Sequence, residues 1–415
     1  MKVYKFGGAS VKDAESVKNV AEVLSLNGNE ECFLVISAMG KTTNKLEEVV
    51  NAYFANADYT ALIDVIQENH LHIAKDLFKE NQKVFSEIEI FFSDILSFLR
   101  RNKSPNYNYV YDQVVGCGEL ISTKIVNEYL VSVGLNTRWL DIRDCIKTDS
   151  TFREGNVDWA ATEKNFKNLK TDSIYVSQGF LGSDDNCMTV TLGREGSDYS
   201  AAIVAYCLNA ESMTIWKDVP GVLNADPRYF NDTQLIEAIS YKEAVELAYY
   251  GASVIHPKTL KPLENKQIPF FVKSFLNPTA KGTVIKNGQP LVPNIPCYII
   301  KKEQYLLEIS SKDFSFIAEE HIGDVFETIS QFGNKVSLIQ TSALCLSLCV
   351  DDKFSNIKKL SDKLLEKYQL EITPNVALYT VKHFQKESYD KVAFGKTVLL
   401  EQITKETLQL IIQEK

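Results

Sequence analysis

The stretch KVYKFGGASVKDA, residues 2–14, joins a predicted strand, Lys2–Phe6, to a helix that begins near Asp13. Its two glycines let backbone N–H groups approach a ligand, and the start of a helix adds partial positive charge, so the turn can hold an anion. Lys5 would direct a full positive charge to the same place. The turn differs from the Walker phosphate loop, because no Gly-Lys-Ser/Thr sequence closes it. A tight turn beside an ordinary surface lysine would have the same sequence. This segment alone therefore leaves open whether it is an anion site or a plain turn.

Further apolar runs of strand length alternate with helical patterns through the first 285 residues. The expected strands are Lys2–Phe6, Cys32–Ile36, Thr137–Leu140, Ile174–Ser177 and Met213–Trp216, and the expected helices include Ala14–Leu26, Leu120–Val133 and Ser200–Cys207. Such alternation predicts an α/β fold with a parallel or mixed sheet covered by helices on both faces. The apolar residues of the next region recur at helical spacing instead, and we expect a helical insertion over about residues 45–105.

A seam rich in proline and glycine, residues 287–296, separates this region from the rest of the chain. Beyond it the pattern predicts the order strand, helix, strand, strand, helix, strand of a ferredoxin-like α+β unit. The expected strands are Tyr305–Ile309, Val336–Gln340, Leu344–Val350 and Val376–Val381, and the expected helices are Asp324–Phe332 and Asn356–Tyr368. The remainder has room for only part of a second copy, ending in a helix over Lys405–Gln413. We therefore expect domains at residues 1–286 and 297–415.

The composition excludes several classes of protein. The 45 lysines and arginines are outnumbered by 54 aspartates and glutamates, a net charge of −9, so no nucleic-acid partner is expected. With 45% hydrophobic and 24% charged residues, the chain can bury a core. No apolar run reaches the roughly 18 residues of a membrane span, and the first residues lack a signal-peptide pattern, so we expect a cytoplasmic location and no membrane partner. The eight cysteines form no Cys-x-x-Cys pair, so we expect reduced thiols and no metal site.

Four other glycine-bearing loops follow predicted strands or open predicted helices. They are ISAMGKTTN at residues 36–44, GCGE at 116–119, TLGREGSD at 191–198 and IWKDVPGV at 215–222, the last followed by DPR at 226–228. Arginine suits bidentate capture of a carboxylate, and Asp198 could orient Lys5 or attract Mg²⁺. Each loop alone has a plainer explanation, such as turn-forming hydroxyls, a carboxylate at a helix start or solvated charges. In an open α/β sheet, however, ligands bind outside the carboxyl ends of the strands, where such loops converge.

Taken together, these motifs make the chain resemble the aspartate kinases of the amino-acid-kinase superfamily. The similarity covers nearly the whole chain, and its strongest stretches are residues 5–11, 37–44, 193–198, 218–221 with 226–228, and 240–260. It implies a three-layer α/β sandwich with a helical insertion, followed by paired ACT regulatory domains, the second shortened or irregular. It also implies ATP-dependent phosphorylation of the side-chain carboxylate of L-aspartate, giving 4-phospho-L-aspartate for lysine, threonine, methionine and isoleucine synthesis. Mg²⁺ would arrive with ATP, and a homodimer or higher homo-oligomer would form through the ACT region.

The resemblance also implies roles for individual residues. Lys5 would stabilise the transferring phosphoryl group, and Asp198 would position Lys5. Arg194 would hold the α-carboxylate of aspartate and Glu119 its ammonium, with Ser37, Thr43 and Ser197 completing the pocket. The ATP-binding residues would be Lys5, Gly7, Gly8, Ser10, Lys217, Asp218, Leu223, Arg228, Ser253 and Val254. Because the nucleophile is already a carboxylate at pH 7, catalysis reduces to positioning and charge neutralisation, without a general base.

Several positions depart from the family pattern. Glu195 stands where many relatives have glycine, Lys217 where many have threonine, and Ser253 where a lysine is frequent; Lys217 or Lys258 would then supply the missing cation. The segment VSLIQTS, residues 336–342, matches the stretch that binds lysine in lysine-sensitive relatives. The implied effector contacts, for L-lysine or L-threonine, are Val336, Ser337, Thr341 and Ser342. Ser337 replaces a common aspartate, which would remove the counter-charge of an effector ammonium, so a purely structural or dimerising role also stays open.

Two other functions stay open at this point. The first keeps the fold and changes the substrate, giving a carboxylate or carbamate kinase; the paired-ACT tail and residues 193–198 disfavour it. The second is a non-catalytic amino-acid sensor. The departures at Glu195, Lys217 and Ser253 motivate it, whereas the retention of Lys5, Arg194 and Asp198 favours an active kinase.

Overall fold

The computed structural model describes residues 1–27, 31–79, 83–169, 173–252, 255–313 and 315–414. The chain divides into two compact units. The first unit comprises Met1–Val222, Leu235–Lys242 and His256–Pro290, and the second comprises Leu223–Gln234, Glu243–Ile255 and Leu291–Lys415. Two short segments that precede the proline-rich seam therefore belong to the second unit. Within the described residues, no helix has both the length and the apolar character that crossing a membrane requires.

An eight-stranded sheet forms the centre of the first unit. In order across the sheet, its strands are β10 (Ala238–Ile239), β12 (Thr283–Ile285), β11 (Phe270–Ser274), β7 (Ser212–Lys217), β1 (Lys2–Phe6), β2 (Cys32–Ile36), β4 (Ile174–Gln178) and β3 (Thr137–Leu140). Neighbouring strands are parallel except for the antiparallel pair β11 and β12. β1 pairs with β2 on one side and β7 on the other, so the carboxyl ends of these three strands lie together. This is the edge at which α/β sheets bind ligands.

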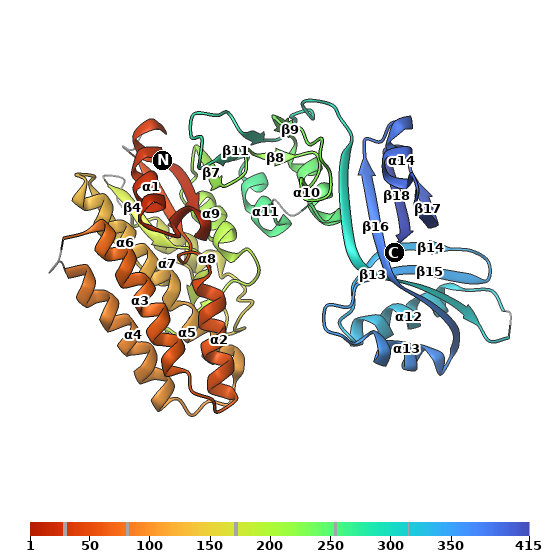
Figure 1. Ribbon diagram of the computed structural model, residues 1–415, viewed down its shortest axis with the longest axis horizontal. Coiled ribbons are helices and arrows are strands. Elements are labelled where there is room, and N and C mark those ends of the chain that lie inside the picture. Colours follow the sequence, from red (N-terminus) through yellow and green to blue (C-terminus); the bar gives the residue numbers. More distant parts are fainter. Residues whose placement is uncertain (28–30, 80–82, 170–172, 253–254, 314, 415) are drawn as a thin grey trace. The chain divides into compact units, whose positions relative to one another are not determined.

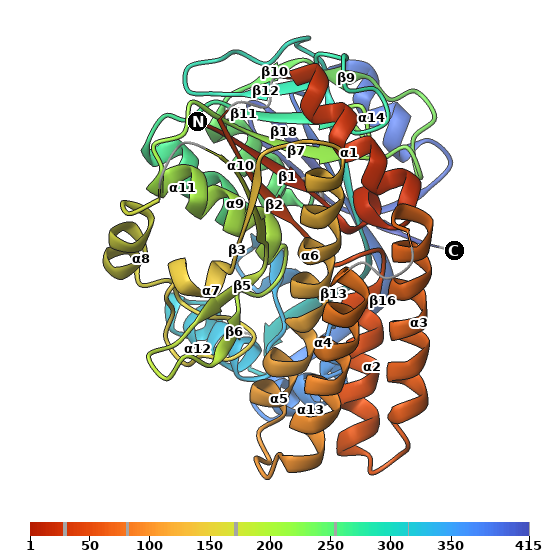
Figure 2. The ribbon, with the colours of Figure 1, turned by 90° about the vertical axis from the view of Figure 1, so that its left-hand side faces the viewer.

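Helices cover both faces of this sheet, which makes the first unit a three-layer α/β sandwich and confirms the predicted fold class. Figure 2 shows α1 (Ala14–Asn27) and α6 (Cys117–Ser132) on one face, with α8 (Trp159–Phe166), α9 (Gly196–Cys207) and α11 (Pro257–Asn265) on the other. The strands between them are buried from both sides, and every residue of β2 is buried. Burial on both faces explains why these strands are near-continuous apolar runs.

The helical insertion expected after the second strand consists of four helices, which lie side by side in Figure 1. They are α2 (Thr42–Phe54), α3 (Thr60–Leu77), α4 (Lys83–Arg101) and α5 (Tyr107–Val115). On α4, the buried residues Ile88, Phe92, Ile95 and Leu99 recur every three or four positions and form one apolar stripe. That stripe joins the same hydrophobic core as α1 and the sheet, so the insertion extends this core and is not a separate body.

Several short elements complete the connections. They are the 3₁₀ turn η1 (Gly8–Val11), α7 (Ile142–Cys145), α10 (Tyr241–Tyr250), the antiparallel pair β5 (Leu181–Ser183) and β6 (Thr189–Thr191), and the two-stranded ladder β8 (Val222–Leu223) and β9 (Leu235–Ile236).

The second unit is built on a six-stranded antiparallel sheet. In order across the sheet, its strands are β14 (Val336–Thr341), β15 (Cys345–Val350), β13 (Cys297–Ser311), β16 (Tyr368–Lys382), β18 (Thr407–Gln413) and β17 (Thr397–Ile403). Three helices pack on it, α12 (Glu319–Gln331), α13 (Ile357–Leu365) and α14 (Lys386–Ala393). From β13 to β16 the order is strand, helix, strand, strand, helix, strand, as predicted.

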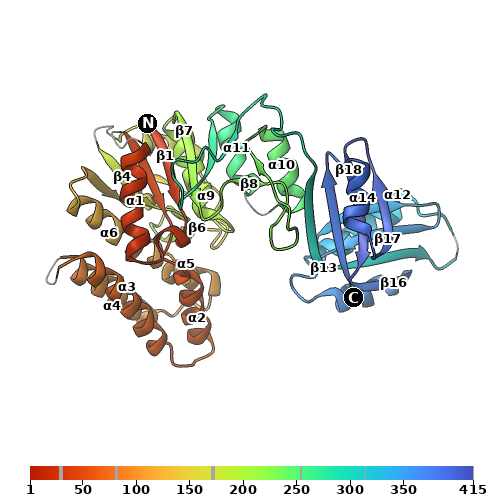
Figure 3. The ribbon, with the colours of Figure 1, turned by 45° about the horizontal axis from the view of Figure 1, so that its top comes forward.

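The two longest strands run through two separate cores of this unit. At one end, Leu307 and Ile309 of β13 pack with Val325 of α12 and Leu360 of α13. At the other end, the second half of β16 packs with α14 and β18, an arrangement visible in Figure 3. A third cluster, which contains Leu306 of β13 and Ile411 of β18, forms on the opposite face of these strands. The half of the unit that follows β16 has one helix, α14, whereas the half from β13 to β16 has two, α12 and α13.

The prediction of a helix over Lys405–Gln413 is wrong, because Thr407–Gln413 is strand β18. Leu408, Leu410 and Ile412 enter one core, while Ile411 faces another. Leu408, Ile411 and Ile412 are also spaced as on one face of a helix. A strand buried on both faces gives an apolar run that periodicity alone does not distinguish from a helix.

The placement of β18 can be tested with a pair of substitutions. Leu410 is fully buried in β18, whereas Ile403, at the end of β17, is 54% exposed. We expect Leu410→Ala to lower the free energy of unfolding by about 2–5 kcal/mol, because it leaves a cavity in the core. Ile403→Ala should change it by less than about 0.5 kcal/mol. Urea unfolding followed by circular dichroism measures both, and equal effects of the two substitutions would contradict the strand assignment.

Candidate functional site

Lys5 is a buried residue near the end of β1, and not the exposed lysine of a surface turn. Its side chain is 9% exposed, and its Nζ lies 2.6 Å from Oδ1 of Asp198. Asp198 comes from the first turn of α9 and is also buried. A buried ammonium needs a close counter-charge, so this ion pair is a condition for placing Lys5 there. The expected contact between Asp198 and Lys5 is therefore present.

Lys217, at the end of β7, is a second cation beside the same carboxylate. Its Nζ lies 3.6 Å from Oδ2 of Asp198. Burial by itself would raise the pKa of Asp198, but attraction to Lys5 and Lys217 outweighs it and holds the pKa below its usual range. Asp198 is thus ionised between two lysines, and the three side chains together carry one positive charge in excess.

The glycine turn after β1 lies against the loop after β2. A Cβ on Gly8 would come within 2.7 Å of the Ala38 carbonyl oxygen and 2.8 Å of the Gly40 carbonyl oxygen, so only glycine fits. The Gly40 N–H donates to the Gly8 carbonyl at 3.0 Å. Ser10 Oγ donates to the Trp216 carbonyl of β7 at 3.3 Å. The turn therefore connects the ends of β1, β2 and β7 around Lys5.

Glu119 lies in the first turn of α6 and is buried. Its Oε1 accepts a long hydrogen bond from the Ala38 N–H, 3.4 Å, and its Oε2 has no hydrogen-bond partner among the described residues. Burial raises the pKa of Glu119 to about 8, although hydrogen bonds and the charge of Lys5 act in the opposite direction. A buried carboxyl that forms no ion pair with another described residue is suited to receive an ammonium group from a ligand.

Arg194 is exposed in the loop before α9, and its side chain makes no ion pair or hydrogen bond with another described residue. The loop is tightly turned, since Gly193 has φ +79° and Glu195, the N-cap of α9, has φ 53°. A left-handed backbone favours glycine, which explains physically why glycine would suit position 195. The arginine is therefore free for a ligand at the same end of α9 as Asp198.

Asp112, on α5, holds this loop, and the sequence analysis missed it. Its carboxylate accepts hydrogen bonds from the backbone N–H of Arg153 and of Thr191, 2.9 Å each, and from Thr191 Oγ1 at 2.7 Å. Burial raises the pKa of Asp112 to about 6. Thr191 directly precedes the Arg194 loop, so Asp112 fixes its starting point. No glycine, turn or strand end marks Asp112, and the sequence offers no signal for it.

The other predicted site residues of the first unit lie near these groups. Ser37 follows β2: its N–H donates to the Phe6 carbonyl at 3.1 Å, and its carbonyl accepts from Ser122 Oγ at 2.7 Å. Thr43 is in the first turn of α2, Ser197 in the first turn of α9, and Asp218 follows Lys217 in an exposed turn. Gly7 approaches Lys5, since its Cβ position lies 3.5 Å from Lys5 Nζ.

The other four predicted ATP-binding residues fall into two groups. Leu223 and Arg228 belong to the second unit. There the Arg228 guanidinium pairs with Asp226 at 2.6 Å and is 72% exposed, which agrees with the simpler interpretation of solvated charges on a turn. Ser253 and Val254 lie outside the described residues.

Two residues of the segment that follows have structural roles. His256 caps α11, with its Nδ1 accepting a hydrogen bond from the Lys258 N–H at 3.2 Å. Lys258 Nζ donates to the Leu192 carbonyl at 3.3 Å and lies 5.2 Å from the centre of the Tyr199 ring. Lys217, which contacts Asp198, is therefore the better candidate for the compensating cation.

The predicted effector residues lie on β14 and the turn that follows it. Ser337 Oγ accepts a hydrogen bond from Lys301 Nζ at 3.2 Å. Burial, together with the nearby charge of Lys335, lowers the pKa of Lys301. Ser337 thus already faces a cation.

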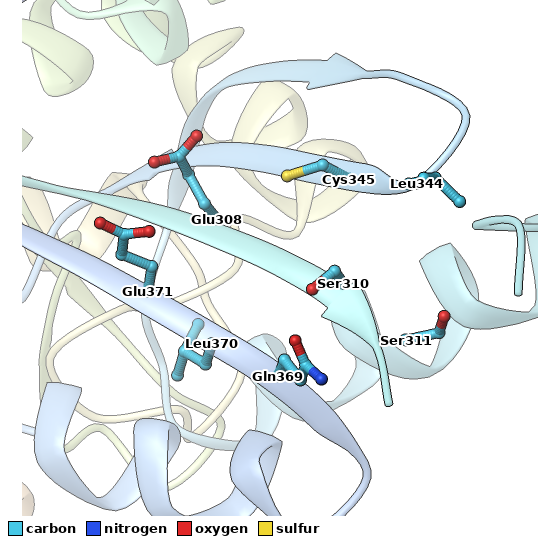
Figure 4. Close-up of a pocket in the computed structure, with 8 residues that line it drawn as sticks. All are labelled: Glu308, Ser310, Ser311, Leu344, Cys345, Gln369, Leu370 and Glu371. Carbon is cyan, nitrogen blue, oxygen red and sulfur yellow. The ribbon is translucent and has the colours of Figure 1, made fainter. Parts of the chain in front are cut away.

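A cavity of about 440 Å³ on the same sheet is lined by other residues, among them Glu308 and Glu371 (Figure 4). These two residues lie directly opposite each other on the neighbouring strands β13 and β16. None of the four predicted effector residues lines this cavity.

The first unit thus carries a lysine pair, a glycine turn and two groups suited to an amino acid at one edge of a parallel sheet. The sequence profile of the amino acid kinase family matches residues 1–274. The chain belongs to the amino acid kinase family. Its sequence is similar to chloroplastic aspartokinase 2 of Arabidopsis thaliana, with 33% identity over 366 residues, covering 84% of this chain and 66% of the relative. It is 31% identical to lysine-sensitive aspartokinase 3 of Escherichia coli K12, covering 84% of this chain and 78% of that protein.

A solved structure extends the similarity to the whole chain. E. coli aspartokinase III in complex with aspartate and ADP (R-state) matches with a TM-score of 0.84 and 26% identity, covering 100% of this chain and 96% of that one. The chain spans between 44% and 66% of the length of the first Arabidopsis relatives, which include a bifunctional aspartokinase/homoserine dehydrogenase.

The raised pKa of Glu119 predicts a pH dependence of stability. Between about pH 4.5, its ordinary pKa, and about pH 8, the folded chain binds one more proton at this carboxyl than the unfolded chain. The free energy of unfolding therefore falls as pH rises through this range. Glu119→Gln removes this titration. We therefore expect the free energy of unfolding of the variant, relative to that of wild type, to rise by roughly 1–4 kcal/mol between about pH 5 and pH 8.

Urea unfolding at several pH values measures this difference. Glu128→Gln, on the same helix, is the matched control and should follow the wild-type profile. A Glu119→Gln profile parallel to that of wild type would contradict the burial of an un-ionised carboxyl.

Proposed function

We propose that the chain is an aspartate kinase, which transfers the γ-phosphoryl group of ATP to the side-chain carboxylate of L-aspartate. The observation that carries the proposal is the pairing of Asp198 with Lys5 at 2.6 Å and with Lys217 at 3.6 Å, beside the glycine turn. E. coli aspartokinase III, solved with aspartate and ADP, has the same fold and supports the choice of substrates.

In the proposed reaction, an oxygen of the aspartate side chain attacks the γ-phosphorus as the bond from phosphorus to the ADP oxygen breaks. No proton has to be removed, because the attacking carboxylate is already ionised. Lys5 and Lys217 neutralise the charge on the phosphoryl oxygens, and Asp198 holds Lys5 in place. The backbone of Gly7 and Gly8 lies close to the phosphates. This is catalysis by positioning and charge neutralisation, as in other phosphoryl transfers.

Two further groups would recognise the amino-acid part of the substrate. Arg194 binds the α-carboxylate, for which a planar guanidinium is well shaped, and Glu119 binds the ammonium. Ser37, Thr43 and Ser197 complete the pocket. A carbamate or simple carboxylate lacks the ammonium and would leave Glu119 without a partner, so this arrangement favours an amino acid.

The nucleotide site has fewer supporting contacts. We assign Ser10, Lys217 and Asp218 to it in the first unit, and Leu223, Arg228, Ser253 and Val254 from the sequence resemblance. Mg²⁺ would be bound by the phosphates of ATP, because Asp198 is already engaged by two lysines. The exposed carboxylate of Asp218 is the protein group best suited to contact it.

We assign residues 1–286 to the kinase domain and residues 297–415 to an ACT-type regulatory region that also forms the homo-oligomer. Val336, Ser337, Thr341 and Ser342 would contact an amino-acid effector there. Because Lys301 donates a hydrogen bond to Ser337, a cationic side chain is disfavoured at this point, and we favour L-threonine over L-lysine.

Hydroxylamine trapping of the acyl phosphate tests the function directly. We expect hydroxamate with ATP and aspartate and none with glutamate, and inhibition by threonine in a further arm. Lys5→Met should lower kcat about a hundredfold or more, because it removes a group that stabilises the transferred charge. Asp198 retains Lys217 in this variant, so the fold should persist, as checked by circular dichroism.

Lys2→Met, on the same strand, is the matched control and should keep the wild-type rate. Absence of hydroxamate together with saturable aspartate binding would instead establish a sensor. A glutamate signal equal to that of aspartate would overturn the substrate assignment.

Aspartate binding should release a proton. At pH 7 Glu119 is mostly protonated in the free protein, and an ammonium beside it makes it ionise, so binding should release up to about one proton. Titration calorimetry in buffers of different ionisation enthalpy measures this number.

Two variants separate the roles in this assay. Arg194→Ala should weaken aspartate binding about tenfold or more while leaving the proton number unchanged, because it removes only the carboxylate contact. Glu119→Gln should abolish the release. Proton release that persists in Glu119→Gln would show that Glu119 does not bind the ammonium.

A further inference from the structure

The first unit has a cavity that takes no part in the proposed phosphoryl transfer. Its volume is about 380 Å³, within the range of small-molecule sites. It is lined by Trp159, Tyr199, Tyr206, Lys258, Lys261, Pro262 and Asn265. These residues come from α8, α9 and α11, which cover one face of the sheet (Figure 2).

Aromatic rings form one side of this cavity. Tyr199 and Tyr206 are seven residues apart, which places them on the same face of α9. The Trp159 ring meets the Tyr206 ring edge-on, with centroids 5.0 Å apart and planes at 69°. Flat surfaces of this kind favour a planar ring over an aliphatic group.

The other side is cationic. Lys258, Lys261 and Asn265 follow one another at spacings of three and four, so they share one face of α11. The side chains of Lys261 and Asn265 make no hydrogen bond or ion pair with another described residue. Glu163 interacts with Tyr206, and this interaction adds to burial in raising the pKa of the Tyr206 hydroxyl. No carboxylate is among the lining residues.

We propose that this cavity is a second ligand site, for a planar aromatic ring that bears a carboxylate or phosphate, and that its occupation acts on the Arg194 loop. The ring lies against Trp159 and Tyr199, and the anionic group is bound by Lys261 and Lys258. The cavity is connected to the loop through the chain itself and through one hydrogen bond. Tyr199 directly follows Asp198, and Lys258 Nζ binds the carbonyl of Leu192, the residue before Gly193. An anion that draws Lys258 away from Leu192 alters the end of the loop that carries Arg194.

Titration calorimetry with phenyl phosphate and benzoate, on the whole chain, tests the binding part. We expect saturable binding of both, tighter for the dianionic phosphate, with cyclohexyl phosphate and benzyl alcohol at least about tenfold weaker. Lys261→Ala should weaken phenyl phosphate binding about tenfold, whereas Lys164→Ala, on exposed α8 surface outside the cavity, should leave it unchanged. No saturable binding of either aromatic anion, or equal binding by the Lys261 variant, would overturn the site.

The regulatory part rests on the proposed function and has its own measurement. Phenyl phosphate should change the aspartate KM of the wild-type chain about fivefold and leave that of Lys261→Ala nearly unchanged. Lys261→Ala without the probe should keep the wild-type kcat and KM. An unchanged KM at saturating probe would overturn the link to the loop, while absence of kinase activity would be seen independently in the hydroxamate assay.

Discussion

One buried carboxylate between two lysines is the constraint on which the site depends. Asp198 reaches Lys5 from α9 at the point where β1 ends, and Lys217 approaches from the end of the neighbouring strand β7. A single charge buried there would be too costly to keep ionised, whereas three charges with alternating sign satisfy one another. The sum is one positive charge at the edge of the sheet, in a chain whose net charge is −9. An anionic phosphate is thus attracted to this edge although the protein as a whole repels it.

The glycine turn can connect neighbouring loops because β1, β2 and β7 end at the same edge of the sheet. Since Gly8 has no side chain, the backbone after β1 can lie against Ala38 and Gly40 after β2. That contact brings the Ala38 N–H to Glu119 at the start of α6. In the proposed function, the group that binds phosphate and the group that binds ammonium are therefore positioned by the same backbone packing. Asp112 fixes the loop of Arg194 in a comparable way, through two backbone N–H groups and one hydroxyl.

The sequence predicted the features that depend on local pattern. The strands and helices of the sandwich, the apolar stripe of α4 and the glycine turn follow from periodicity and backbone freedom. The burial of Lys5 could not be predicted, because the sequence around a charged residue at a strand end does not show which other residues cover its side chain. Asp112 lies within a helix without any motif, and its partners are distant in sequence. The strand β18 was mistaken for a helix because both of its faces are buried. Leu223–Gln234 and Glu243–Ile255 belong to the second unit through tertiary packing, which no composition change marks.

The protonation of Glu119 connects the stability of the free protein with the choice of substrate. A carboxyl buried without an ion-pair partner is most stable when neutral, and burial therefore raises the pKa of Glu119 to about 8. The free protein at neutral pH therefore avoids most of the desolvation cost of an ionised group. A ligand with an ammonium turns the same carboxyl into an ion pair, whereas a ligand without one leaves it neutral and gains nothing from it. Under the proposed function, discrimination comes from the difference between these two states, so that a carboxyl that is mostly uncharged in the free protein would select for an amino acid.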